Sequence, residues 1–165
     1  TAVLLAGCAT PTPPDPTAEM PHCYKTNKGR VIACTPVAAP SLNADAEAKR
    51  FVPDRDALTV YVVRRNWGDG RNFVKVYPDG GAGVDTLPDT MVRFKFKPGS
   101  HSVAFEFDGK RQSTTVEGRA GETRFLRFDG MVWAWKSTYE WVVESETATR
   151  ERALKARLVA DVAVL

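Results

Sequence analysis

Residues 92–107 read VRFKFKPGSHSVAFEF, and this stretch decides the fold class. On both sides of a Pro-Gly-Ser turn, apolar side chains alternate with polar ones, first at Val92, Phe94 and Phe96 and then at Val103, Phe105 and Phe107. A period of two is typical of a β-strand with one buried face. We predict a hairpin in which Phe96 pairs with Val103. Its register puts Phe94 opposite Phe105 and Arg93 opposite Glu106.

The same period continues on both sides of this stretch, in short segments separated by Gly-, Asp- and Pro-rich turns. Further strands are predicted at residues 58–63, 73–77, 112–116, 123–128, 131–135, 139–144 and 159–165. A convincing helix is predicted only at residues 147–157, and residues 45–50 form a shorter helical patch. The sequence therefore predicts a mainly β protein, an antiparallel β-sandwich with one C-terminal helix, over residues 45–165.

Composition and charge agree with an ordinary globular domain. The 165 residues are 43% hydrophobic and 26% charged, and 23 basic against 20 acidic side chains give a net charge of +3. The basic residues are scattered, whereas proteins that bind nucleic acid concentrate them on one face. We expect no nucleic-acid partner.

An apolar run, residues 2–7, precedes the first cysteine. It is shorter than the about 20 residues that a membrane-spanning helix needs, and it looks like the end of a secretory signal. Leu5-Ala6-Gly7-Cys8 resembles the lipobox of bacterial lipoproteins. That resemblance implies cleavage after residue 7, diacylglycerol and further acylation at Cys8, and a stable membrane anchor. Ala9 favours the outer membrane of a cell envelope, because an Asp in that place commonly retains such proteins in the inner membrane. The alternative is a chance match within an ordinary signal or a buried helix end.

Residues 8–44 are predicted to form a lipidated, Pro-rich stalk, because residues 9–22 contain too many prolines for a helix or a paired strand. Cys23 and Cys34 flank a turn-forming Asn27-Lys28-Gly29 stretch, so we predict a disulfide-closed hairpin there. The alternative is a metal site of His22, Cys23 and Cys34, which lacks a fourth ligand nearby. Residues 35–43 are expected to be loose.

Two short motifs carry a family resemblance: Lys97-Pro98-Gly99-Ser100-His101-Ser102-Val103, and Arg119-Ala120-Gly121-Glu122-Thr123. Together with the lipobox, they resemble the small bacterial lipoproteins with the domain of unknown function 2846, a transthyretin- or PEGA-like β-sandwich. The resemblance covers about residues 46–160. It implies an envelope-anchored sandwich and carries no agreed activity, so it assigns no catalytic residue.

For the two histidines and for the Gly-rich loop at residues 79–83, a structural role is favoured over a catalytic or binding role. His101 follows Pro-Gly-Ser and is expected to hydrogen-bond within the turn, and His22 is expected to be solvated on the stalk. Asp79-Gly80-Gly81 and Gly83 lack the following helix and lysine of a phosphate-binding loop, so a plain loop is favoured. We expect neither a metal nor a cofactor.

Aromatic and basic residues supply the candidate binding sites. Trp133, Trp135 and Trp141 lie near Tyr139, and burial in the core is the favoured interpretation at this spacing. If exposed, the indole rings could stack on sugar, peptide or a partner protein. Arg64, Arg65, Trp67 and Arg71 could form a contact loop, although a solvated loop is favoured.

No catalytic arrangement of residues stands out, so we expect a non-enzymatic envelope module that binds or scaffolds another envelope component. One alternative is a glycan- or peptidoglycan-binding lipoprotein that uses exposed tryptophans. Another is an inhibitor or immunity-type lipoprotein that blocks an enzyme.

We expect protein extracted from its native membrane to begin at Cys8, to carry acyl chains, and to lack two hydrogens at the Cys23–Cys34 pair. The Cys8→Ser variant should be neither cleaved nor acylated, because the thiolate is the acylated nucleophile. Intact-mass spectrometry of both proteins measures this. An uncleaved, unmodified mass for the unaltered chain would contradict the anchor.

Overall fold

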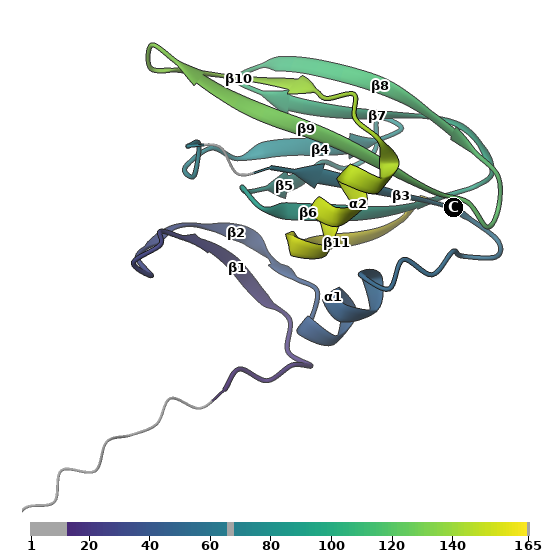
Figure 1. Ribbon diagram of the computed structural model, residues 1–165, viewed down its shortest axis with the longest axis horizontal. Helices are drawn as coiled ribbons and strands as arrows, with labels where there is room; N and C mark the ends of the chain where they lie inside the picture. Colours follow the sequence, from purple (N-terminus) through teal and green to yellow (C-terminus); the bar gives the residue numbers. More distant parts are fainter. Residues whose placement is uncertain (1–12, 66–67, 165) are drawn as a thin grey trace, which may run out of the picture.

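Two β-sheets form the centre of the protein in the computed structural model, which describes residues 13–65 and 68–164 (Figure 1). The five-stranded sheet has the order β10 (Lys136–Trp141), β9 (Thr123–Trp133), β3 (Leu58–Arg64), β6 (Thr90–Phe96), β11 (Arg157–Val164). The four-stranded sheet has the order β5 (Val84–Thr86), β4 (Val74–Pro78), β7 (Gly99–Phe107), β8 (Lys110–Gly118). A hairpin of β1 (Met20–Lys25) and β2 (Val31–Ala39) lies beside them. The predicted mainly β sandwich is confirmed.

The main core lies between the two sheets. Alternate residues of each strand point inward, so that Val60 and Phe94 of one sheet join Val76 and Phe105 of the other in a single buried cluster. Ala39, at the end of β2, belongs to the same cluster and attaches the hairpin to the sandwich. The period of two in the sequence therefore reports which side chains fill this core.

Two helices cover the outer face of the five-stranded sheet. They are α1 (Leu42–Ala48) and α2 (Glu146–Lys155), with Ser41 and Ser145 as N-caps whose hydroxyl oxygens accept backbone N–H groups. Between helices and sheet lies a second buried cluster: Ala48, Phe51, Tyr61, Val63, Met91, Ala153, Ala156 and Leu158. β3 is consequently buried on both faces. The predicted C-terminal helix is confirmed, and no helix among the described residues has the length and apolar character needed to cross a membrane.

The predicted hairpin of residues 92–107 is wrong. β6 pairs with β3 and β11, whereas β7 pairs with β4 and β8, so that Phe94 and Phe105 face the same core from opposite sheets. The Pro98-Gly99 corner carries the chain from one sheet to the other. Alternation identifies the buried face of a strand, but not whether the next strand lies beside it or across the core.

The position of Arg93 also differs from the one that the predicted hairpin implies. Because the helices cover its face of the sheet, its guanidinium is nearly buried and does not contact Glu106. It donates to Asp161 of β11 at 2.6 and 2.9 Å and to Glu47 of α1 at 2.8 Å. Arg93 thereby ties the last strand and the first helix to the centre of the sheet.

Several local expectations also change. β3 pairs with β9, and β6 with β11, in parallel, whereas the remaining strand pairs are antiparallel. Residues 35–43 are not loose, since β2 continues to Ala39 and α1 begins at Leu42. Residues 20–22, which were expected to be too Pro-rich for a paired strand, begin β1, and Met20 and Pro21 pair with the end of β2. β9 also runs unbroken through residues 129 and 130, where a turn was expected.

We expect Phe94→Ala to lower the free energy of unfolding by about 3–5 kcal/mol, because it removes a fully buried ring from between the sheets. Phe73→Ala is the matched control, because Phe73 is exposed and should cost under about 1 kcal/mol. Urea unfolding followed by circular dichroism measures both variants. Equal losses would contradict the assigned core.

Candidate binding site

The β1–β2 hairpin is fixed by a disulfide. Cys23 and Cys34 face each other in the strand register, with an S–S distance of 2.04 Å and a Cα–Cα distance of 3.9 Å. The predicted pairing is confirmed, and each sulfur atom is bonded to the other rather than available to a metal. His22 is half-buried in β1 rather than solvated, and burial lowers the pKa of its imidazole.

The tip of the β9–β10 hairpin presents tryptophans to solvent. Trp133 is 80% exposed and Trp135 100% exposed, so the favoured interpretation of a buried pair is wrong for both. Trp133 pairs with Lys136, and the chain reverses at Ala134 and Trp135, which both have positive φ, 45° and 68°. This two-residue turn extends beyond the sandwich, so that the alternation there no longer indicates a core face.

Trp141 differs from the other two tryptophans of this region. Its ring packs against Phe105 and Phe128 of the main core, with centroid distances of 5.1 and 5.8 Å. Trp141 is partly buried against the main core, so the favoured interpretation of burial holds for it only in part. The tryptophans that the sequence grouped together divide between core and surface.

Arg64 lies at the centre of a buried polar network, and the suggestion that it belongs to an exposed contact loop is wrong. Its Nη1 donates to the carbonyl oxygen of Thr86 at 2.6 Å, and its Nη2 to Asp69 Oδ2 at 2.6 Å. The side chains of Arg64 and Asp69 have no exposed area. The Tyr139 hydroxyl also donates to Asp69 Oδ2, at 2.6 Å. Burial raises the pKa of Tyr139, so its phenol stays protonated and able to donate.

Glycine is required where this network meets β9. A Cβ atom at Gly130 would lie 2.7 Å from the Tyr139 ring and 2.8 Å from Asp69 Oδ2. Gly70 likewise allows a close approach of the backbone to a ring, because a Cβ there would lie 2.5 Å from the ring of Tyr24. The two glycines let the 68–72 loop pack against both hairpins.

A hollow of about 660 Å³ opens between these elements, and we call it the tryptophan hollow. The β1–β2 hairpin supplies one wall, the loop after β3 the floor, and the β9–β10 hairpin the opposite wall. Its lining consists of Tyr24, Thr26, Ile32, Gly68, Asp69, Gly70, Arg71, Asn72, Val132, Trp135 and Ser137. Two residues singled out from the sequence, Arg71 and Trp135, thus meet at one site.

Polar groups of the tryptophan hollow are held in place by the network beneath it. Asn72 Nδ2 donates to Ser137 Oγ at 2.8 Å and to the Tyr139 hydroxyl at 3.2 Å. Because Tyr139 also contacts Asp69, the floor and one wall of the hollow share a single hydrogen-bonded system. No sequence pattern pointed to Tyr24, Asn72 or Ser137, because they come from distant segments that meet only on packing.

The other candidate residues lie elsewhere. Arg65 is exposed and does not line the hollow, and Cys8 and Trp67 are outside the described residues. His101 confirms its expected role in the turn: its Nε2 lies 2.7 Å from the carbonyl oxygen of Lys97, and its Nδ1 lies 2.6 Å from Asp79 Oδ2. The loop that begins at Asp79 leads into strand β5 and not into a helix, as expected of a plain loop.

Hydrogen bonds stabilise the ionised form of the Asp79 carboxylate. Burial opposes the charge of the carboxylate, but His101 and the backbone N–H of Ser102 donate to it and bring its pKa below the ordinary value. Within residues 13–65 and 68–164, no three His, Cys, Asp or Glu side chains gather as a metal site would require.

Comparison with known proteins finds no family model and no curated protein that match this chain.

We expect Asp69→Ala to lower the free energy of unfolding by about 3–5 kcal/mol, because it leaves the buried Arg64 guanidinium without a counter-charge. The double variant Arg64→Met, Asp69→Ala should recover much of this loss, since it removes the buried charge as well. Arg71→Met, which removes an exposed charge, is the control and should change little. Urea unfolding compares the three, and a double variant no more stable than Asp69→Ala would contradict the network.

Proposed function

We propose that this chain is a membrane-anchored lipoprotein of the bacterial cell envelope that acts as a non-enzymatic binding module through the tryptophan hollow. The observation that carries the proposal is the full exposure of Trp135 at the lip of a hollow whose other walls are held by a disulfide and a buried ion pair. Large exposed aromatic side chains on a fixed frame are typical of binding surfaces. The Cys8 anchor would hold this surface close to envelope components.

The ligand class that the hollow fits best is the saccharide of the cell wall. Flat indole and phenol rings, at Trp135 and Tyr24, can stack on the apolar faces of sugar rings. The lining also includes the hydrogen-bonding side chains of Thr26, Arg71 and Ser137. Sugars need both kinds of contact, because each ring has apolar faces and a rim of hydroxyl groups.

The chemistry of the hollow favours binding over hydrolysis. Glycoside hydrolysis generally requires a pair of carboxyl groups, one as acid and one as base or nucleophile. Among the described lining residues, Asp69 carries the single carboxyl group, and its Oδ2 already accepts from Arg64 and Tyr139. Asp69 therefore supports the frame of the hollow.

A protein ligand is the second candidate, as a scaffold or an inhibitor of an envelope enzyme would require. Trp133 favours it, because it is 80% exposed at the hairpin tip and does not line the hollow. Tryptophan and arginine are enriched among residues that dominate the energetics of protein interfaces. A protein edge could cover Trp133 and Trp135 together.

We expect soluble peptidoglycan fragments to change the tryptophan fluorescence of the whole chain in a saturable way. Trp135→Ala should weaken binding about tenfold or more, because loss of a stacking tryptophan costs about 2 kcal/mol. Val143→Ala is the control, because Val143 is exposed and does not line the hollow.

The result also separates the candidates. Unchanged fluorescence with glycan, together with Trp135-dependent retention of an envelope protein, would favour the scaffold or inhibitor. If glycan causes no fluorescence change and no envelope protein is retained through Trp135, the tryptophan hollow is not a binding site. Turnover of an envelope substrate would contradict a non-enzymatic role.

A further inference from the structure

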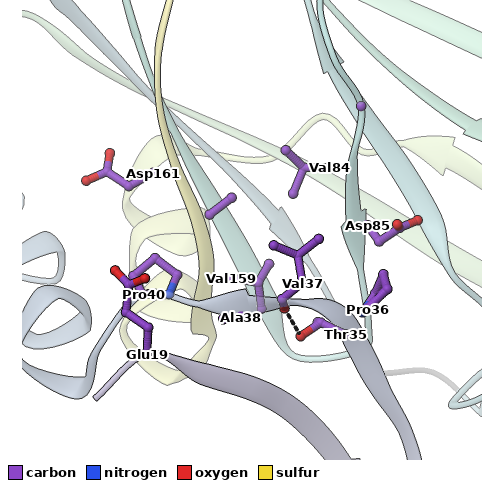
Figure 2. A pocket seen from close by; sticks show the side chains of 12 residues that line it. Glu19, Thr35, Pro36, Val37, Ala38, Pro40, Val84, Asp85, Val159 and Asp161 are labelled. Atoms are coloured by element: carbon purple, nitrogen blue, oxygen red, sulfur yellow. Dashed lines mark hydrogen bonds between the residues drawn. The ribbon is translucent and has the colours of Figure 1, made fainter. Parts of the chain in front are cut away.

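A second hollow, of about 340 Å³, lies on another side of the sandwich, and we call it the edge groove (Figure 2). Its volume falls within the range of about 300–1,000 Å³ that is typical of ligand sites. It lies between β2, β5 and β11 and shares no residue with the tryptophan hollow. The edge groove therefore requires its own explanation.

The centre of the edge groove is apolar. Figure 2 shows Val37 of β2, Val84 of β5 and Val159 of β11 gathered in the middle of the site. Val37 is 73% exposed and lies in the irregular part of β2, between the paired residues Cys34 and Ala38. Val159 is buried in the main core and Val84 is half-buried, so contact with Val37 and Val84 above Val159 would favour an apolar ligand side chain.

Three strand edges meet at this groove. β5 and β11 are the outermost strands of the two sheets, and β2 has β1 as its neighbour on the opposite side. In the described part of the chain, no backbone hydrogen bond joins β2 to β5 or to β11. β2 packs against β5 and β11 without pairing with either strand, so the N–H and C=O groups left along these edges can pair with an added extended segment.

The rim of the groove is acidic. Glu19, Asp85 and Asp161 surround the valines, and no lysine or arginine is among the lining residues. Asp85 binds Lys75 at 2.7 Å and Asp161 binds Arg93 at 2.6 Å, whereas Glu19 is exposed on the segment that leads into β1. Because Arg93 is shared between Asp161 and Glu47, and Glu19 is exposed, negative charge remains in excess at this rim and favours a ligand with positive charge.

We propose that the edge groove binds an extended peptide segment of a partner protein, in which apolar side chains alternate with lysine or arginine. The segment lies beside β2 and β11 and uses its backbone groups to pair with an uncovered edge. Its apolar side chains contact Val37, Val84 and Val159, and its cationic side chains point to the acidic rim. This inference does not depend on saccharide binding at the tryptophan hollow.

The test uses three fluorescent probe peptides and the whole chain with Cys8→Ser. The first peptide alternates lysine and valine, the second replaces each lysine with glutamate, and the third replaces the central valine with proline. We expect the first peptide to bind and to weaken as salt is added, because salt screens charge pairing. The other two should bind at least about tenfold more weakly, because the second has the wrong charge and the third cannot complete the strand pairing.

Two matched substitutions locate the site. Val37→Lys should weaken the first peptide at least about tenfold, because it places a cation among the valines. Val143→Lys adds the same charge at an exposed valine outside the groove and should leave binding unchanged. Circular dichroism and thermal unfolding of both variants confirm that they remain folded.

Two kinds of result would overturn peptide binding at the edge groove. Equal binding of the three peptides, or no effect of Val37→Lys, overturns the proposal. Sedimentation that shows a dimer of the unaltered chain and a monomer of Val37→Lys also overturns it, because the occupant is then a second copy.

Discussion

A guanidinium group without exposed area lies where the two sheets, the 68–72 loop and β10 meet. Removing such a charge from water is costly unless counter-charge and hydrogen bonds surround it, and Arg64 obtains these from Asp69, Thr86 and Tyr139. Those partners belong to three different parts of the fold. The floor and one wall of the tryptophan hollow therefore have defined positions, because the ion pair does not tolerate their displacement.

Much of the fold could be predicted from the alternation of apolar residues, which placed most strands of the sandwich, and the capped helix α2 was equally evident. The arrangement of strands could not be predicted in this way. Phe94 and Phe105 have the same pattern whether they are neighbours in one sheet or face each other across the core. Arg93 looked like a solvent-facing residue, because nothing in the local pattern indicates that helices from both ends of the domain cover it.

The candidate site was less predictable than the fold. The disulfide followed from two cysteines around a turn, which is local information. Trp133 and Trp135 continued a strand pattern, but the chain turns at residues 134 and 135, beyond the edge of the core. Arg64 lies at the end of a strand next to a Gly-rich loop, where exposure is the usual expectation. Its burial depends on Tyr139, from a strand far along the chain.

The parallel pairing of the five-stranded sheet has a consequence for how the protein acquires its structure. The central strand β3 requires β9, and β6 requires β11, which comes last in sequence among the strands of the described residues. Contacts between distant segments slow folding, because long loops must close before any pairing is gained. The sheet therefore cannot be completed on a growing chain until β11 has been synthesised, and until then the strand β6 has one edge that any other extended chain could occupy.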